Sequence, residues 1–233
     1  ATAERDGVAM LEVASQYNDL HRQPGSPPHV RSQLTEAATA RVAKSFENAK
    51  RDADFVVASF HWGVHCLPAS LAEYEKSLAR LAIDHGADVV LGHHQHILKG
   101  VDFYKGKPIL HGLGNFAFDL LDIEKIASPE AVRETIEIYG EYGIFSREGY
   151  PTVPFHEESR MTVVAHVALE TGQDPVVELT PCMINTKGQP TPIPASDELA
   201  FSAFLAYVKR IHWLADLRTG IERAGDRISI RAA

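Results

Sequence analysis

Two short apolar runs, each followed at once by a histidine-rich segment, most constrain the fold that this sequence can adopt. Residues 54–60 read DFVVASF and residues 88–91 read DVVL. Apolar side chains recur at helical spacing in residues 34–49 and 71–81, and another apolar run, residues 7–15, comes first. The order is strand, helix, strand, helix, strand. It predicts an α/β fold with a parallel sheet, because strands that are apolar throughout need covering on both faces.

The ends of the expected helices carry residues that suit those positions. Ser32 is available as the N-cap of the first helix, and Ser70 with Glu73 three residues later forms a capping-box pattern before the second. Gly86 suits the left-handed position that ends a helix. A last long helix is expected to begin near Ser196.

Beyond residue 100 the pattern changes to short extended pieces and an antiparallel hairpin. Residues 161–169 alternate apolar with more polar side chains, which predicts a strand of a second sheet that differs from the solid apolar strands before it. Residues 122–159 form an excursion over the active face. The elements expected in this part are 101–104, 108–111, a helix at 129–138, the hairpin 161–184 and a helix at 199–211.

Charge and composition exclude some classes of function. Lys and Arg number 23 against 31 Asp and Glu, and the resulting net charge of -8 disfavours nucleic acid as a partner. No apolar run reaches the roughly 18 residues of a membrane span, so no span is expected in this chain. Cys66 and Cys182 are too few for a disulfide framework. They are expected to be buried thiols, with a single disulfide left open, and the sequence does not identify a compartment.

Histidines follow both apolar runs at the carboxyl ends of neighbouring strands. His61 and His65 follow the first run, and the segment GHHQH, with His93, His94 and His96, follows the second. In open parallel sheets the carboxyl ends of strands carry the ligand site, so these side chains should converge. Imidazole binds transition metals in its neutral form. The arrangement predicts a metal site in which Gly63 and Gly92 let the backbone turn sharply.

A second candidate segment, residues 111–119, reads HGLGNFAFD. Asn115 can hydrogen-bond a substrate or a metal-bound water, or it can occupy a left-handed position in a tight turn. His111, like His65, is a candidate to protonate a leaving group. Phe116 and Phe118 suit the core better than a substrate platform. Histidines with no such context are expected to be structural: His21, His29, His85, His156 and His212.

The segments DADFVVASFHWG, IDHGADVVLGHHQH and YKGKPILHGLGNFAFD, within residues 52–119, resemble the CapA family of poly-γ-glutamate capsule synthesis proteins. That family belongs to the calcineurin-like metallophosphoesterase superfamily. The resemblance implies an α/β fold in which a β-sandwich is flanked by helices, in four layers α, β, β and α, with a two-metal site at strand ends. It assigns His61, His94 and His96 as metal ligands, with His93 as a rival for one place.

The sequence departs from the family pattern in ways that bear on the substrate and on whether the metal site is complete. His65 stands where Glu is frequent, Gln95 where Pro is, and His111 where Tyr is. The early superfamily motifs that supply an aspartate and an asparagine ligand are not found in residues 1–60. Asp6-Gly7 has the reverse order of the expected Gly-Asp pair, and Asn18-Asp19 lies in an expected loop. Residues 1–233 are therefore expected to be one metallophosphoesterase-like domain whose N-terminal part lies upstream.

Three functions remain open on this reasoning. In the first, a metal-dependent hydrolase uses two divalent transition metal ions (Mn, Fe or Zn) to activate water on a small or oligomeric anionic substrate, cleaving a phosphoester, an amide or a lactone-like ester. In the second, a non-catalytic module binds or assembles an anionic polymer such as poly-γ-glutamate. In the third, an upstream segment or a second copy completes the site. The chain alone is then expected to bind at most one metal ion, weakly, with Asp119 as the nearest carboxylate.

Overall fold

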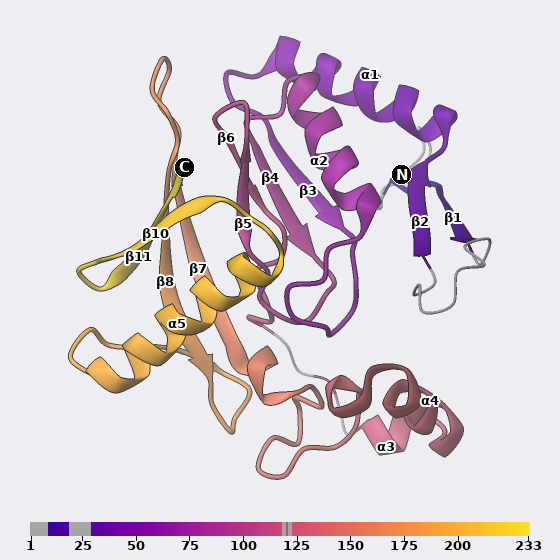
Figure 1. The fold of residues 1–233 in the computed structure, drawn as a ribbon, viewed down its shortest axis with the longest axis vertical. Helices are drawn as coiled ribbons and strands as arrows, with labels where there is room; N and C mark the ends of the chain where they lie inside the picture. Colours follow the sequence, from indigo (N-terminus) through magenta and orange to yellow (C-terminus); the bar gives the residue numbers. More distant parts are fainter. Residues whose placement is uncertain (1–8, 19–28, 118–119, 121–122) are drawn as a thin grey trace. The chain divides into compact units, whose positions relative to one another are not determined.

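The computed structural model describes residues 9–18, 29–117, 120 and 123–233, and these form an α/β protein with three sheets. The chain divides into two compact units (Figure 1). One comprises residues 1–56 and 72–88, and the other residues 57–71 and 89–233. Each is described by itself below. The expectation of a single domain stays a prediction.

The first unit contains a two-stranded antiparallel sheet and two helices. Strand β1 pairs with β2 over six residues, and α1 packs against α2. The expectation that residues 7–15 supply a strand of the parallel sheet is wrong, because β1 begins at Val13 and its pairing, within the described residues, is with β2. The bounds are β1 Val13–Asn18, β2 His29–Leu34, α1 Glu36–Asp52 and α2 Glu73–Asp84.

The helix starts differ from the expected ones by a few residues. The Thr35 side chain, rather than Ser32, caps α1 by accepting a hydrogen bond from the Ala38 amide. Before α2 the Ala72 amide donates to the carboxylate of buried Glu75 at 2.6 Å, so Ser70 with Glu73 is not the cap. Ser32 lies within strand β2, which continues to Leu34, so the extended segment before α1 ends later than expected.

The second unit contains the expected parallel sheet. Its strand order is β3-β4-β6-β5, in which β3, β4 and β6 run parallel and β5 closes a hairpin with β6. Both apolar runs of the sequence analysis are therefore confirmed as neighbouring parallel strands. The bounds are β3 Val57–His61, β4 Val89–His93, β5 Val101–Tyr104 and β6 Lys107–Leu110.

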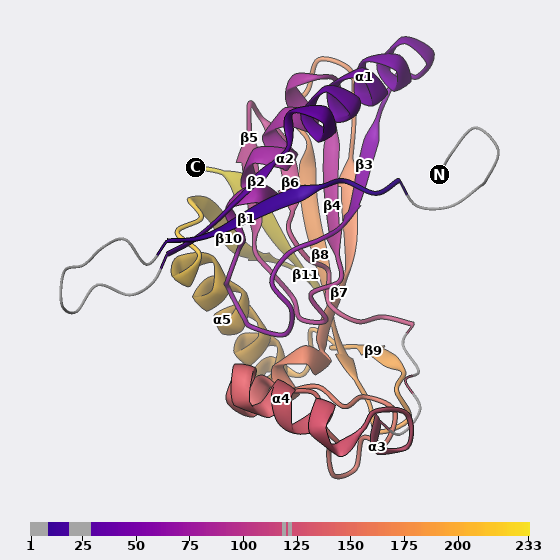
Figure 2. The same cartoon turned by 90° about the vertical axis from the view of Figure 1, so that its right-hand side faces the viewer.

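A second, antiparallel sheet lies in the same unit, and α5 runs alongside it (Figures 1 and 2). The expected hairpin is confirmed as β7 and β8, whereas the hairpin of β10 and β11 was not anticipated. Asp197 caps α5, one residue after the expected Ser196. The bounds are β7 Met161–Ala168, β8 Val176–Ile184, β9 Pro190–Pro192, α5 Glu198–Leu214, β10 Thr219–Ala224 and β11 Arg227–Ala232.

Between β6 and β7 the chain contains several short helices, in the region where an excursion was expected. The helix predicted at 129–138 is confirmed as α4, which Ser128 caps by accepting from the Ala131 amide. A short segment after it, η2, returns the chain to β7. The bounds are α3 Ile123–Ile126, α4 Pro129–Tyr139, η1 Gly140–Tyr142 and η2 Glu157–Arg160.

One apolar core in the second unit draws on both sheets and on α5. Val89 and Leu110 of the parallel sheet, Leu179 and Ile230 of the antiparallel sheet, and Phe204 of α5 belong to the same buried cluster. This burial is the main source of stability for such a layered arrangement. Elsewhere in the chain, Cys66 and Cys182 are free and buried, as expected. In the described part of the chain, no helix is long and apolar enough to cross a bilayer.

His212 joins α5 to the parallel sheet from inside this core. Its Nδ1 donates to the Val208 carbonyl at 2.7 Å, and its Nε2 accepts from the Val101 amide at 2.8 Å. Burial lowers the pKa of His212, so the ring is neutral, as this pair of bonds requires. His212 therefore has the structural role that the sequence analysis expected.

Replacing His212 by leucine is expected to lower the free energy of unfolding by about 1–3 kcal/mol, because the buried Val101 amide loses its acceptor. Urea denaturation of the variant and the parent chain measures this difference. His85→Ala is the control, since His85 pairs with Glu47 at the surface and its loss should matter little. Equal unfolding midpoints for His212→Leu and the parent would contradict the assigned role.

Candidate functional site

The parallel register of β3 and β4 places two histidines side by side at the carboxyl end of the sheet. His61 is the last residue of β3 and His93 the last of β4, and the two are register partners. The Trp62 amide then donates to the His93 carbonyl at 3.0 Å and extends the pairing by one bond. The loops that follow β3 and β4 therefore begin next to each other.

The carbonyl of His111 joins the loops that follow all three parallel strands. It accepts from Trp62 Nε1 at 3.0 Å and from Gln95 Nε2 at 2.8 Å. Gly92 is needed for this approach, because a Cβ there would lie 1.9 Å from that carbonyl oxygen. The expected sharp turn is found at Gly63, whose φ is 93°, whereas Gly92 serves close packing.

Four histidine side chains meet where these loops converge, and we call His61, His65, His94 and His96 the histidine cluster. The ring centroids of His61 and His94 are 4.6 Å apart. His65 lies 5.0 Å from His94 and 5.1 Å from His96. His94 and His96 are 6.5 Å apart. The structure therefore brings together the three residues proposed as ligands, and His65 lies among them.

The backbone around the cluster is held in an unusual conformation. Four non-glycine residues of these loops have positive φ: Cys66 (59°), Ala69 (57°), His94 (96°) and His96 (54°). Residues with a Cβ are disfavoured in this region by roughly 1–3 kcal/mol each, and such strain concentrates at functional sites. The strain at His94 and His96 is compatible with a requirement that both rings point to one place.

Asn115 sets the tautomer of His96. Its Nδ2 donates to the carbonyls of His96 and Ser159, at 3.1 and 3.3 Å. Its Oδ1 therefore faces His96 Nδ1, at 2.6 Å, and that nitrogen must carry the proton. The lone pair of the ring consequently resides on Nε2. A histidine that ligates metal through one nitrogen while the other donates to a fixed acceptor has this arrangement.

Two features around the cluster were not apparent from the sequence. Phe155 stacks on His96, with ring centroids 4.5 Å apart, and covers one side of the cluster. Buried Lys99 donates to the carbonyls of Leu67 and Ser70, and so ties down the loop that carries His65. An isolated lysine after GHHQH carries no sequence pattern that distinguishes it from a solvated one.

The environment keeps three members of the cluster, His65, His94 and His96, neutral near pH 7. Burial, followed by the charges of His96 and the other histidines, lowers the pKa of His65 from 6.5 to about 4. Burial also lowers the pKa of His94 and of His96, and that of His93 at the end of β4. A neutral imidazole offers a lone pair. In this state His65 is a proton acceptor or a ligand rather than the proton donor that the sequence analysis considered.

The remaining predicted residues take other positions. The side chain of His111 is fully buried and stacks on Trp62, with centroids 6.1 Å apart, so it does not join the cluster. Of the two alternatives for Asn115, the left-handed turn is not found there but at Gly114, whose φ is 78°. Phe116, expected in the core, is 47% exposed. Asp119 and Phe118 lie outside the described residues, as do Asp6, Asp19 and His21.

The cluster fits a divalent metal by chemistry more than by its present geometry. Its donors are imidazole nitrogens, and the tautomer of one ring, His96, is fixed. Among the described residues, however, no three His, Cys, Asp or Glu side chains form a group that holds an ion as they stand. Asp88, which the sequence places near β4, instead bonds Lys50 and the Val56 amide within the first unit.

Comparison with known proteins identifies a family whose model covers the residues of the histidine cluster. The family model described as bacterial capsule synthesis protein PGA_cap matches residues 2–120. A capsule biosynthesis protein CapA of Bacillus anthracis is 36% identical over 97 residues, which cover 42% of this chain and 22% of that protein. A PGA biosynthesis protein CapA of Bacillus subtilis (strain 168) is 42% identical over 71 residues, covering 30% and 18%.

A third relative, a probable polyglutamine synthesis accessory protein of Mycobacterium tuberculosis, is 35% identical over 89 residues, covering 38% of this chain and 22% of that protein. The matched part thus spans about a fifth of the length of these relatives. Since the family model matches residues 2–120 of 233, the chain belongs to the family of the bacterial capsule synthesis protein PGA_cap.

Proposed function

We propose that this chain takes part in the synthesis of an anionic capsule polymer of the polyglutamate type, and that its histidine cluster binds a divalent transition metal for a hydrolytic step. The names of its relatives support the first part. The observation that carries the second part is the pairing of Asn115 with His96, which keeps the Nε2 lone pair on a neutral ring.

The residues of the chain would divide the work as follows. His61, His94 and His96 hold the ion, and His93, at the end of β4, is the alternative for one place. A bound divalent ion supplies Lewis-acid chemistry for hydrolysis. Asn115 is a positioning residue that acts through His96. Neutral His65 accepts a proton or adds a ligand. The four-layer metallophosphoesterase architecture and a second ion are part of this proposal.

A second candidate function is a binding module without catalysis. It is favoured because, among the described residues, no three His, Cys, Asp or Glu side chains form a group that could hold an ion. Two divalent ions close together repel strongly, and a bridging carboxylate normally offsets that repulsion. A chain with the histidines alone would then bind one ion or none, and an upstream segment or a second copy would complete a hydrolytic site.

Metal content and turnover separate these functions. The chain is stripped with a chelator and reloaded with Mn²⁺, Fe²⁺ or Zn²⁺. Bound metal is then measured by mass spectrometry, and hydrolysis with generic phosphoester and ester substrates. We expect at most one weakly bound ion per chain, little turnover, and loss of the ion in His94→Ala but not in the surface control His85→Ala.

A chain extended upstream in the same gene, tested in parallel, is expected to bind two ions and to turn over. Equal two-metal loading and equal rates for both chains would contradict the idea that the site is incomplete. Absence of bound metal in both would support the binding module instead.

Removing the Asn115 side chain is expected to weaken metal binding by about 10–100-fold, because His96 loses the acceptor that fixes its tautomer. Titration with Co²⁺, followed by its absorption, measures this. Asn115→Asp restores the acceptor and should bind more tightly than Asn115→Ala. Asn48→Ala on α1 is the control, because the Asn48 side chain bonds Arg51 of the same helix and belongs to the other unit. An Asn115→Ala chain that is folded and binds as tightly as the parent would remove the support for this role.

Stability of the metal-free chain should fall on acidification between pH 6.5 and about 4. In that window the unfolded chain binds a proton at His65 that the folded chain excludes, since the folded pKa of His65 is about 4. The loss approaches about 3 kcal/mol at the acid end and does not grow further below it. Urea unfolding at several pH values measures this. His65→Asn should remove this contribution and so flatten the dependence over this window, and an unchanged slope would contradict the assignment.

A further inference from the structure

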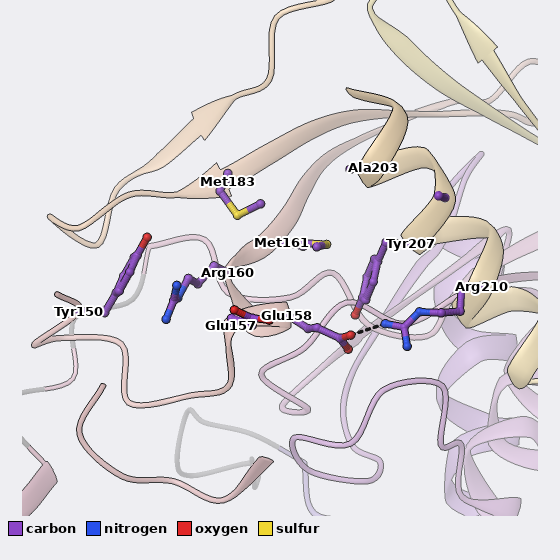
Figure 3. Close-up of a pocket in the computed structure, with 10 residues that line it drawn as sticks. Tyr150, Glu157, Glu158, Arg160, Met161, Met183, Ala203, Tyr207 and Arg210 are labelled. Atoms are coloured by element: carbon purple, nitrogen blue, oxygen red, sulfur yellow. Dashed lines mark hydrogen bonds and ion pairs between the residues drawn. The ribbon is translucent and has the colours of Figure 1, made fainter. Parts of the chain in front are cut away.

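A second cavity in the same unit lies outside the histidine cluster (Figure 3). Its volume is about 620 Å³, and η2, the start of β7, the end of β8 and α5 line it. Neither the relatives' names nor the family description assigns a role to it. We call it the Arg160 pocket, after the residue on which the following argument rests.

Arg160 presents a pre-ordered guanidinium at one end of this pocket. Its central carbon lies 3.5 Å from the ring centroid of Tyr150, so the group stacks on the ring, and Figure 3 shows the two side by side. Within the described residues no carboxylate pairs with it, and its buried Nε has no hydrogen-bond partner there. A stacked, unpaired guanidinium is suited to bidentate binding of a planar anion.

A nearby arginine adds positive charge at the same end. Burial lowers the pKa of Arg147, and the charge of Arg160 lowers it further, which shows that the two guanidinium groups repel each other. The Arg147 Nη2 is already used by the carbonyls of Glu141 and Gly143. An anion on Arg160 would relieve this repulsion.

The opposite end of the pocket is electrostatically balanced. Arg210 forms an ion pair with Glu158, which the dashed line in Figure 3 marks, and the Tyr142 hydroxyl donates to the same carboxylate at 3.4 Å. Tyr207 is 5% exposed, and its hydroxyl has no hydrogen-bond partner among the described residues. Of the two guanidinium groups that line the pocket, Arg210 is therefore paired, and Arg160 is the one without an ion pair among the described residues.

The wall between these ends is apolar. Met161, Met183 and Ala203 line the pocket, and they also line an adjoining cavity of about 560 Å³ that Ile193 and Phe204 extend. Methionine side chains adapt to ligands of varied shape. A ligand that places an anionic head on Arg160 can lay an aliphatic stem along this wall.

The acidic residues of the pocket distinguish between oxyanions. Glu157 lines it beside Glu158, whose charge Arg210 offsets, so a dianionic phosphate would meet more repulsion from Glu157 than a singly charged carboxylate would. We propose that the Arg160 pocket binds a carboxylate carried on an aliphatic stem, either of a small acid or of a repeating unit in a polymer. The site needs no metal, so it stands or falls separately from the hydrolytic proposal.

The segment that carries Arg160 also touches the histidine cluster. Phe155 stacks on His96, and the Ser159 carbonyl accepts from Asn115, which bonds His96. Arg160 is the next residue. A ligand held on Arg160 is therefore bound by the same short stretch of backbone that supports the cluster.

Calorimetric titration of the chelator-treated chain tests the proposal with three probes that share one stem: hexanoate, hexanamide and hexyl phosphate. We expect hexanoate to bind, hexanamide not to bind, and hexyl phosphate to bind more weakly. Arg160→Gln should weaken hexanoate at least about tenfold, as loss of a charge-assisted pair predicts. Arg133→Gln is the control, because Arg133 pairs with Glu130 on exposed α4.

A second pair of variants keeps the test decisive if Arg160→Gln does not fold. Tyr150→Phe retains the ring under the guanidinium and should bind as the parent does, whereas Tyr150→Leu removes it and should bind more weakly. A γ-linked glutamate oligomer distinguishes the sources: binding of the oligomer alone assigns the pocket to a polymer, and binding of hexanoate assigns it to a small acid as well. Unchanged binding in Arg160→Gln, phosphate as tight as carboxylate, or no binding of either carboxylate would overturn the proposal.

Discussion

The backbone carbonyl of His111 is the point on which the geometry of the candidate site depends. Trp62 and Gln95 both donate to it, so the loops after β3, β4 and β6 are tied to one atom. This contact needs Gly92, because a side chain there would collide with the carbonyl. The Cys66 amide then bonds the Gln95 carbonyl at 2.8 Å and brings the loop of His65 to that of His94 and His96. The convergence of the histidines therefore follows from backbone packing rather than from any attraction between the rings.

The histidine cluster combines two unusual features, lowered pKa values and a strained backbone. Burial, and after it the charges of the neighbouring imidazoles, disfavour the protonated ring, which is why the pKa of His65 falls to about 4. The left-handed φ of His94 and His96 costs free energy that burial elsewhere offsets. Asn115 then orients one ring by accepting a hydrogen bond from His96 Nδ1. Nitrogen lone pairs held in place at strand ends are what a divalent metal site requires, and the proposed function rests on them.

The Arg160 pocket gives the second unit a separate means of engaging an anionic ligand. The net charge of -8 makes general attraction to a polyanion unfavourable, so a local guanidinium site is the physically reasonable way to hold a carboxylate. The short segment from Phe155 to Arg160 contacts the histidine cluster on one side and lines the pocket on the other. A polymer carboxylate bound there would be compatible with either proposed function, hydrolysis or polymer binding.

The sequence by itself determined the α/β class, the neighbouring parallel strands and the placement of His61 and His94 at their ends, because apolar runs and strand-end positions are local properties. It also placed the β7–β8 hairpin, whose alternation is local. Only the tertiary structure decided that His65 joins the cluster, that the side chain of His111 is buried, and that Asn115 orients His96, since these depend on which loops a shared carbonyl brings together. The same holds for Lys99, which bonds backbone carbonyls that are remote in the chain. It also holds for Arg160, whose guanidinium stacks on a tyrosine ring that the loop geometry presents.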